Sequence, residues 1–312
     1  MSDRQNNIIM KKLVIAAGTG FLGNVIIEHF LQKFTEIIVL TRGKSRQENN
    51  IRYVHWNAKS LGEWEIELEN ADVLINMAGK SVDCRYNEKN KKEILLSRIK
   101  STKILNEAVL QCQNPPKHWL NSSTATIYRH SEDKQMDEYT GEIGNDFSMN
   151  VAQSWEKAFF KTETPQTKKT ALRTSIVLGK KGGAFPPIKN LVQMGFGGKQ
   201  GSGNQFISWI HEEDFTRAID FIIEKEITGK VNLVSPEPIQ NKVFMKTLRK
   251  EMKIPFGTPL GKRMLEFGAK IIGTETELIL KSRNVIPKRL QENGFKFRFS
   301  ELQGAFKELL TK

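Results

Sequence analysis

The feature that most limits the fold of this chain is a glycine-rich loop near its N-terminus, with the pattern Gly-x-Gly-x-x-Gly. An apolar run before the loop predicts a buried strand, and an amphipathic pattern after it predicts a helix. In that setting Gly18 permits a tight turn, Gly20 lets the backbone approach a pyrophosphate, and Gly23 allows the helix to pack closely on the strand. The alternative is a glycine turn without a ligand. We expect a dinucleotide site whose cofactor contacts include Gly18, Thr19, Gly20, Phe21, Leu22 and Gly23.

Strand and helix patterns alternate through the first half of the chain. Short apolar, β-branched runs predict strands at residues 12–17, 36–40, 51–55, 72–77, 118–122 and 170–178. Helical periodicity predicts helices at residues 21–33, 87–111 and 148–163. This alternation is typical of a parallel sheet covered by helices on both faces, and we therefore predict an α/β fold with a doubly wound Rossmann sheet.

The alternation weakens after residue 179, where glycine- and proline-rich segments separate the predicted elements. Further helices are predicted at residues 212–224, 241–252, 260–271 and 300–310. We predict a smaller C-terminal α/β substrate lobe packed on the carboxyl edge of the sheet. The predicted domains are therefore residues 1–178, which bind the nucleotide, and residues 179–312, which bind the substrate.

The residues after the second predicted strand favour NADP over NAD. A site that prefers NAD places an acid there for the ribose 2′-hydroxyl, whereas an arginine accommodates a 2′-phosphate. This chain has Thr41 and Arg42 at that point, with Lys44 and Arg46 close by in sequence. We predict NADP(H) as the cofactor, in contact with Thr41 and Arg42. The alternative for Arg42 is a solvated loop charge.

The composition is that of a globular protein, and its cysteines fit a reducing compartment. The chain has 312 residues, of which 38% are hydrophobic, so it can bury a large core. The two cysteines, Cys84 and Cys112, lie outside any CxxC pair. The first apolar stretch is too short for a signal peptide, and no run is long enough to span a membrane. We expect a cytoplasmic protein without a membrane partner. No metal is expected, because the five histidines show no metal-ligand spacing.

The net charge of +13 is concentrated near the C-terminus, where residues 241–312 contain 16 basic and 7 acidic side chains. Such a region can attract an anionic small molecule, nucleic acid or a membrane surface, and an ordinary solvated surface is the alternative. The chain has no uninterrupted basic run and no signature of a nucleic-acid-binding module. We therefore favour a small-molecule partner over nucleic acid.

Two segments carry a resemblance to a known superfamily: AAGTGFLG at residues 16–23 and INMAG at residues 75–79. They resemble the extended, sugar-nucleotide-epimerase-like branch of the short-chain dehydrogenases/reductases. The segments LRTSIVLG at 172–179, GSGNQFISWIHEEDF at 201–215 and NGFKF at 293–297 are similar to one subgroup of that branch. Its members carry an added C-terminal domain of unknown function, which falls here at about residues 240–312, and some are labelled cell division inhibitors.

The resemblance implies NADP(H) bound across the carboxyl edge of a Rossmann sheet, with a substrate lobe above it. By position it places the backbone of Ala78 and Gly79 along the cofactor, and Ile176 and Val177 near the nicotinamide. Many extended relatives dimerise, so the resemblance leaves a monomer and a homodimer open.

The superfamily's proton carrier is absent from this sequence. It is a Tyr–Lys pair in the pattern YxxxK, in which the lysine lowers the tyrosine pKa toward working pH. Ala152 and Glu156 occupy the two positions here. A strand-end hydroxyl cluster remains, and we take Thr124, Ser123 and Tyr128 as catalytic candidates. The alternative for Thr124 is a hydroxyl that bonds the local backbone.

Substrate contacts are predicted from both parts of the chain. Arg85 and Arg98 follow the fourth predicted strand, where an arginine can clamp a carboxylate or phosphate. Gln205, Trp209 and His211 lie in the second part and are candidates to face the substrate. The alternative for His211 is a structural place near the start of the helix that follows it.

The sequence therefore predicts an NADP(H)-binding oxidoreductase or epimerase-like enzyme. Its substrate is expected to be small and anionic or sugar-nucleotide-like. The missing Tyr–Lys pair leaves a second hypothesis open, namely a non-catalytic NADP(H)-binding sensor or protein-interaction module.

Overall fold

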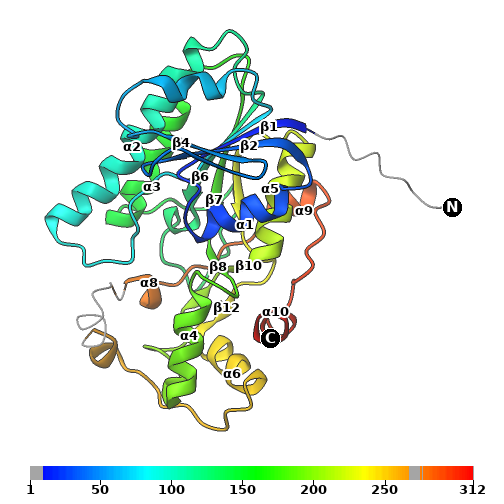
Figure 1. The fold of residues 1–312 in the computed structure, drawn as a ribbon. Coiled ribbons are helices and arrows are strands. Elements are labelled where there is room, and N and C mark those ends of the chain that lie inside the picture. The colour runs from blue at the N-terminus through cyan, green and yellow to red at the C-terminus, as the bar shows by residue number, and fades with distance from the viewer. Residues whose placement is uncertain (1–9, 267–274, 276, 312) are drawn as a thin grey trace.

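The computed structural model describes residues 10–266, 275 and 277–311 of the chain. Its centre is an eight-stranded sheet in the order β11-β7-β6-β5-β1-β2-β4-β3 (Figure 1). All neighbouring strands are parallel except β3 and β4. The strands are β1 (Met10–Ala16), β2 (Phe34–Thr41), β3 (Arg46–Glu48), β4 (Ile51–His55), β5 (Val73–Asn76), β6 (His118–Thr124), β7 (Lys168–Thr174) and β11 (Gly229–Leu233). The predicted α/β class with a Rossmann sheet is confirmed.

Helices cover both faces of this sheet, as the apolar strands require. Strand residues alternate between the faces, so Leu13 and Ile15 of β1 point to one core while Val14 and Ala16 point to the other. The first face packs against α1 (Phe21–Phe30) and α5 (Glu212–Glu224). The second packs against the 3₁₀ helix η1 (Glu63–Leu68), α2 (Glu88–Gln111) and α3 (Phe147–Phe160). A further 3₁₀ turn, η2 (Ala125–Ile127), follows β6.

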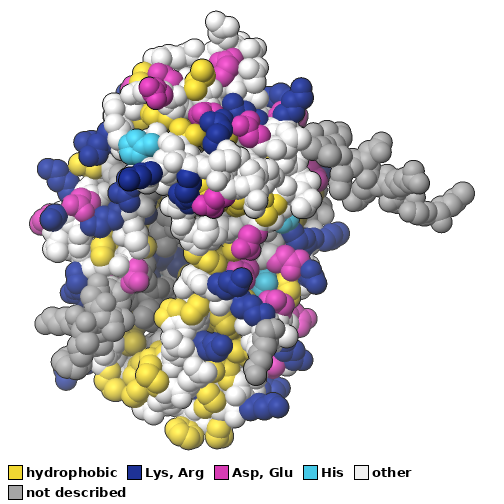
Figure 2. Space-filling view, viewed as in Figure 1, with side chains coloured by type: hydrophobic (Ala, Val, Ile, Leu, Met, Phe, Trp, Pro, Cys, Tyr) yellow, Lys and Arg dark blue, Asp and Glu magenta, His cyan; other side chains and the backbone are white. Residues whose placement is uncertain are grey.

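A smaller lobe lies beyond the carboxyl edge of the sheet, and its own core joins Phe185, Trp209, Phe244 and Phe306. Apolar side chains also gather on its surface (Figure 2), where Met194, Phe196, Phe256 and Met264 are exposed. Its strands are β8 (Ile176–Leu178), β9 (Phe206–Ile207), β10 (Trp209–His211) and β12 (Ile239–Gln240). The helices with both ends among the described residues beyond β8, apart from α5, are α4 (Phe185–Leu191), η3 (Val192–Phe196), α6 (Asn241–Glu251), α8 (Glu277–Leu280), α9 (Lys288–Glu292) and α10 (Leu302–Leu310).

The predicted strand at residues 170–178 is two strands in the structure. β7 stays in the main sheet, but the backbone leaves it at Ser175, whose N–H donates to the carbonyl of Leu233 at 3.2 Å. β8 then pairs with β10. An apolar run alone did not show that its two halves pair with different strands. The predicted helix at 260–271 is helical at residues 262–266, and its end lies outside the described residues.

The chain passes between the sheet and the smaller lobe more than once. α5 and β11 belong to the main sheet and its cover, although they follow β8 and β10 in sequence. Both lie in the range predicted for the substrate lobe, residues 179–312. The boundary near residue 178 stays a prediction.

Candidate functional site

The glycine-rich loop connects β1 to the N-terminus of α1. Gly20 is the N-cap of α1, no side chain caps the helix, and its first turn contains no acid. Thr19 and Gly20 are exposed. The first N–H groups of α1 are therefore available to an anion, which the helix dipole favours at this end.

The three glycines of the loop have different reasons to be glycine. A Cβ on Gly23 would lie 2.1 Å from the carbonyl oxygen of Gly18, so the packing of α1 on the loop requires glycine there. A Cβ on Gly18 would lie 2.7 Å from the Ile15 side chain. A Cβ on Gly20 would meet nothing within 4 Å, so contacts inside the protein do not require glycine at that position. A ligand that approaches the backbone at Gly20 accounts for it, and the loop fits a pyrophosphate.

The Phe21 side chain of this loop packs against the segment that follows β8. A Cβ on Gly179 would lie 2.1 Å from the Phe21 ring, and one on Gly182 would lie 2.5 Å from it. These glycines make room for the ring. The sequence did not reveal this contact, because a glycine-rich segment does not show which side chain it accommodates. Leu22, the next predicted contact, packs partly buried against the core shared with α1.

Two arginines that follow β2 in sequence, Arg42 and Arg46, have different surroundings. Thr41 is buried, and its hydroxyl accepts a hydrogen bond from the Gly43 N–H at 3.1 Å. Arg42 is exposed, and its side chain makes no ion pair with any described residue. Arg46 stacks on Tyr53, 3.6 Å from the ring centre, and binds Glu48 at 2.6 Å. The structure therefore distinguishes Arg42 from Arg46 as a candidate for a 2′-phosphate.

At the end of β5, the backbone that is predicted to contact the cofactor lies beside a half-buried arginine, Arg98. The buried Ala78 donates its N–H to Asn76 Oδ1 at 3.0 Å. A Cβ on Gly79 would lie 3.1 Å from the Arg98 guanidinium carbon. That guanidinium donates to the carbonyls of Lys80 and Ile94, both at 3.0 Å, and lies 5.0 Å from the Trp155 ring centre. Burial lowers the pKa of Arg98 to about 10.

Arg85, the other predicted anion clamp, is already engaged. Its guanidinium lies 3.4 Å from a carboxylate oxygen of Glu275, whose other oxygen accepts the Tyr86 N–H at 2.7 Å. Burial raises the pKa of the Tyr86 hydroxyl to about 12. Of the two arginines predicted to bind an anion, Arg98 lies beside the protein backbone that is predicted to contact the cofactor, whereas Arg85 forms an ion pair with Glu275.

The hydroxyls at the end of β6 have separate environments. Thr124 is half-buried, caps η2 by accepting the Thr126 N–H at 3.1 Å, and lies 2.8 Å from the Thr126 hydroxyl. This is the local backbone bond that the alternative interpretation of Thr124 describes. Ser123 is buried and donates to Glu156 Oε1 at 2.6 Å. Thr124 and Thr126 therefore form the accessible hydroxyl pair.

A buried polar network replaces the Tyr–Lys pair. Ala152 is fully buried, and Glu156 binds Arg173 of β7 through two hydrogen bonds of 2.8 Å. Arg173 donates to the Tyr128 hydroxyl at 2.7 Å, which in turn donates to Asn232 Oδ1 at 3.0 Å. Burial opposes the charge of Arg173 most strongly, but its hydrogen bonds and charge interactions with Glu156 and Tyr128 together outweigh burial and raise its pKa.

This network corrects the prediction for Tyr128. The side chain is 1% exposed and burial raises its pKa, so it can neither reach a substrate nor release a proton near neutral pH. The sequence did not point to Arg173 as a member of this network. The available signal was a charged residue directly after the apolar Ala171 and Leu172 of β7, away from the two lysines at the start of that strand. Such a residue is expected to have a buried acid as its partner.

The predicted nicotinamide contacts lie on β8, next to the glycine segment that holds Phe21. Ile176 is half-buried and Val177 is buried. They pair with Trp209 and Ile210 of β10.

The residues predicted to face the substrate from the smaller lobe are buried. Trp209 is 1% exposed and packs in the lobe's core. His211 is 2% exposed, accepts the Glu213 N–H at the start of α5, and lies 2.9 Å from Glu308 Oε2. Gln205 is buried and donates to the Gln200 carbonyl at 2.8 Å. The structure assigns Trp209 and His211 to packing and helix capping, and Gln205 to bracing its own loop.

The described ranges contain neither a metal-binding cluster nor a membrane-spanning helix. No three His, Cys, Asp or Glu side chains there are grouped to hold a metal ion. No helix there is long and apolar enough to cross a membrane.

Two sequence families match the chain. The NAD dependent epimerase/dehydratase family matches residues 13–234, and a domain of unknown function, DUF1731, matches residues 265–309. The epimerase family protein YfhF of Bacillus subtilis is 32% identical over 305 residues, covering 96% of this chain and 98% of that protein. The epimerase family protein SAR0825 of Staphylococcus aureus is also 32% identical, over 97% of this chain and 100% of its own.

Solved structures give the same relationship. The human epimerase family protein SDR39U1, crystallised with NADPH, superposes with a TM-score of 0.84 at 27% identity, covering 96% of this chain and 98% of that one. A nucleoside-diphosphate sugar epimerase of Corynebacterium glutamicum superposes with a TM-score of 0.77 at 25% identity, covering 97% of this chain and 59% of that one.

Proposed function

Because this chain belongs to the NAD dependent epimerase/dehydratase family, we propose that it binds NADP(H) on the loop at residues 18–23 and uses it for hydride transfer with a small anionic substrate. The observation that carries the proposal is the open backbone at Gly20. The glycine there has no packing role, and the N-terminus of α1 behind it has neither a side-chain cap nor an acid. Both features suit a pyrophosphate.

The preference for NADP(H) over NAD(H) rests on the end of β2. Arg42 is exposed there and bound to no acid of the described chain, and no acid occupies the ribose position. A 2′-phosphate supplies the anion that such an arginine lacks. The human relative crystallised with NADPH supports this choice.

The hydroxyl pair at the end of β6 orients the substrate in this proposal. Ligands of such sheets bind beyond the carboxyl ends of the strands, which is where Thr124 and Thr126 lie. NADPH, when bound, supplies a hydride to a carbonyl carbon. One hydroxyl of the pair donates to the substrate oxygen while the other supports it. Glu156, which occupies the lysine position of the superfamily's Tyr–Lys pair, is held by Arg173 and is not available to them as a proton carrier. The balancing proton therefore comes from water.

A direct test is to measure NADPH and NADH affinity side by side by calorimetry. We expect NADPH to bind at least about tenfold more tightly, because one charged hydrogen bond contributes about 1.5–3 kcal/mol. Equal affinities would reject the role of Arg42, and absence of binding by either cofactor would reject the site.

A second function is a non-catalytic NADP(H) sensor, which the buried Glu156–Arg173 pair favours. An ion pair fixed where the proton carrier belongs suits a protein that holds the cofactor without consuming it. The two functions are separated by single-turnover absorbance of bound NADPH against carbonyl compounds and nucleotide sugars. Oxidation of NADPH by any of them, lost in the Thr124→Ala variant, supports the enzyme; stable NADPH with every compound supports the sensor.

A further inference from the structure

Arg283 is a cation whose surroundings do not satisfy it. Its Nε and Nη1 atoms are buried and have no hydrogen-bond partner in the described chain. Burial lowers the pKa of this guanidinium below its ordinary value, although Asp146 and Glu277 partly oppose the shift. A buried polar group without a partner destabilises a fold by about 1–3 kcal/mol, and a charged group by more.

The nearby acids are bound to another residue. Lys281 forms ion pairs with both Asp146 and Glu277, and its bond to Glu277 is 2.7 Å long. Asp146 also caps α3, since its Oδ1 accepts the Met149 N–H at 2.9 Å. Neither carboxylate makes a hydrogen bond or ion pair with Arg283. Among the described residues, no carboxylate therefore pairs with the positive charge of Arg283.

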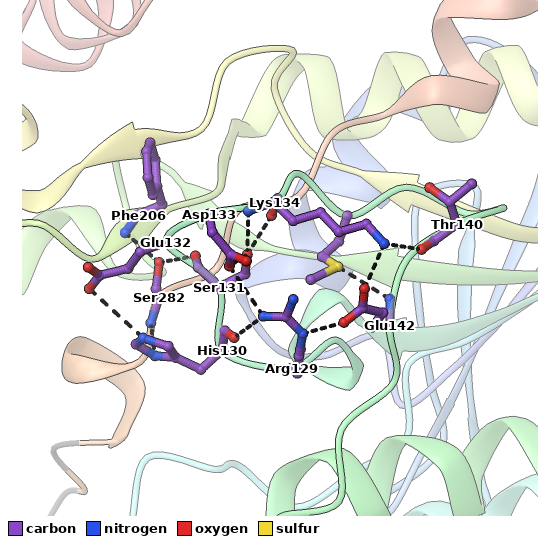
Figure 3. A network of polar contacts seen from close by, with 11 residues as sticks. Arg129, His130, Ser131, Glu132, Asp133, Lys134, Thr140, Glu142, Phe206 and Ser282 are labelled. Atoms are coloured by element: carbon purple, nitrogen blue, oxygen red, sulfur yellow. Dashed lines mark hydrogen bonds and ion pairs between the residues drawn. The ribbon is translucent and has the colours of Figure 1, made fainter.

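The backbone around Arg283 is held independently of its side chain. The Arg283 N–H donates to the Phe206 carbonyl at 2.8 Å, and its carbonyl accepts the Ser208 hydroxyl at 2.7 Å. Figure 3 shows Ser282 between Phe206, Ser131 and His130. The Ser282 hydroxyl donates to the Ser131 carbonyl at 2.5 Å and accepts the Phe206 N–H at 2.8 Å. The guanidinium is not needed to hold this segment in place.

The segment lies beyond the carboxyl end of β6, where a substrate is expected. The loop that follows β6 and η2 runs beside it, since Met136 and Val285 form a parallel bridge. Ala125 and Ile127 of η2 share a small core with Val285 and with Ala152 of α3. The segment that contains Arg283 therefore lies at the carboxyl edge of the sheet, as do the hydroxyls of Thr124 and Thr126.

We propose that Arg283 binds an oxyanion of the substrate, a carboxylate or a phosphate group. This inference rests on the proposed function, since it assigns the anionic group of that function's substrate to one residue. Arg283 is half-buried, unlike the enclosed Tyr128, so an oxyanion that approaches its guanidinium can supply the acceptors that Nε and Nη1 lack. Retaining an unpartnered cation at the cost of stability is typical of a residue kept for binding.

The test compares Arg283→Met with Arg173→Met, which removes a second buried arginine. If Arg283 serves binding, Arg283→Met keeps or raises Tm. The substitution removes an unpartnered charge and puts a side chain of similar volume in its place. Arg173→Met lowers Tm, because it leaves Glu156 unpaired. Arg283→Gln serves as a second variant if the methionine protein does not fold. A Tm loss in both Arg283 variants as large as that in Arg173→Met would show a structural role and overturn the proposal.

The binding arm uses inorganic pyrophosphate and D-glucuronate as phosphate and carboxylate probes, with the protein saturated with NADPH so that the cofactor loop is filled. We expect one probe to bind, to lose roughly 10–100-fold in affinity in Arg283→Met, and to be partly restored in Arg283→Lys. NADPH affinity should not change. If neither probe binds the wild type, or Arg283→Met binds equally well, the proposal is wrong. If NADPH itself does not bind, that result appears before any probe is added, and it rejects the proposed function alone. The affinities of the wild type and the Arg283 variants for the two probes are then compared without cofactor.

Discussion

Arg42 follows β2 and Arg46 begins β3 four residues later, and their surroundings predict different effects on cofactor choice. We expect Arg42→Ala to lower NADPH affinity by roughly 10–100-fold and to leave NADH affinity unchanged, because it removes only a contact to the 2′-phosphate. Arg46→Ala is the matched control, since Arg46 is already stacked on Tyr53 and paired with Glu48. Calorimetric titration of both variants with both cofactors checks this. An unchanged NADPH/NADH ratio in Arg42→Ala would disprove the assignment.

Single residues also show where reasoning from sequence succeeds and where it stops. The place of the glycine loop between β1 and α1 could be predicted because the spacing of Gly18, Gly20 and Gly23 carries its own geometry, and its contacts with a cofactor stay predictions. The roles of Tyr128 and Arg173 could not, because both depend on a contact between β7, the loop after β6 and α3. The burial of Trp209 could not be predicted either, because tryptophan occurs both in hydrophobic cores and on binding surfaces.

The turn from β1 into α1 offers a pair of glycine substitutions with opposite effects. Gly20→Ala should lower the free energy of unfolding by no more than about 1 kcal/mol, because its Cβ meets no atom within 4 Å and alanine is only a poorer N-cap than glycine. It should still weaken NADPH binding at least about tenfold, since the methyl group enters the space for the pyrophosphate. Gly23→Ala should cost about 2 kcal/mol or more, because its Cβ would lie 2.1 Å from a backbone oxygen. Urea unfolding and NADPH titration of both variants separate the two effects; normal NADPH binding by Gly20→Ala would reject the phosphate loop.

The contact between α3 and β7 predicts strong coupling between Glu156 and Arg173. Arg173→Met alone should cost about 3–5 kcal/mol, because it leaves a buried carboxylate without its partner. Adding Glu156→Leu should recover much of that loss, since no buried charge remains. The exposed pair Lys91 and Glu88 is the control, and Lys91→Met should cost under about 1 kcal/mol. Urea denaturation of the four proteins measures the coupling. A double variant as unstable as Arg173→Met would contradict it.

Elements with one dominant pattern could be predicted closely. α5 has the predicted bounds, residues 212–224, because its apolar face repeats clearly against the sheet. The continuous apolar run at 170–178 carries no such information, since a buried strand shows its environment but not its neighbour. Tertiary pairing divides it between β7 and β8.

The alternation of elements predicted a parallel sheet covered on both faces, but it predicted neither the strand order nor the way in which the smaller lobe connects to the sheet. The chain forms β8 and β10 of that lobe before β11 completes the sheet. Pairings between segments so far apart in sequence leave no periodic signal in either segment. The domain boundary is for that reason the least determined part of the sequence analysis.

The stability of the whole molecule should fall as pH falls from 7 to 5, and His118 provides a defined part of that change. Burial lowers the pKa of His118 to about 4. Its Nε2 lies 2.8 Å from the Thr170 hydroxyl oxygen, while that hydroxyl donates to the Ile227 carbonyl. Nε2 is therefore the protonated nitrogen, and a second proton on Nδ1 would find no acceptor among the described residues. The unfolded chain binds that proton below about pH 6.5, and the folded protein does so only below about pH 4.

The unfolded state therefore binds more protons between these two values, so protonation favours unfolding and stability is lost as pH falls through this window. The difference between pH 7 and pH 5 should be about 2 kcal/mol for this one group. In His118→Gln, where no proton can be taken up, the loss between pH 7 and pH 5 should be smaller by that amount. His55→Gln, which changes an exposed histidine, should retain the wild-type pH dependence. Urea unfolding at both pH values measures the three proteins. Equal pH dependence in wild type and His118→Gln would mean that the buried imidazole is protonated at no cost, contrary to its unpartnered Nδ1.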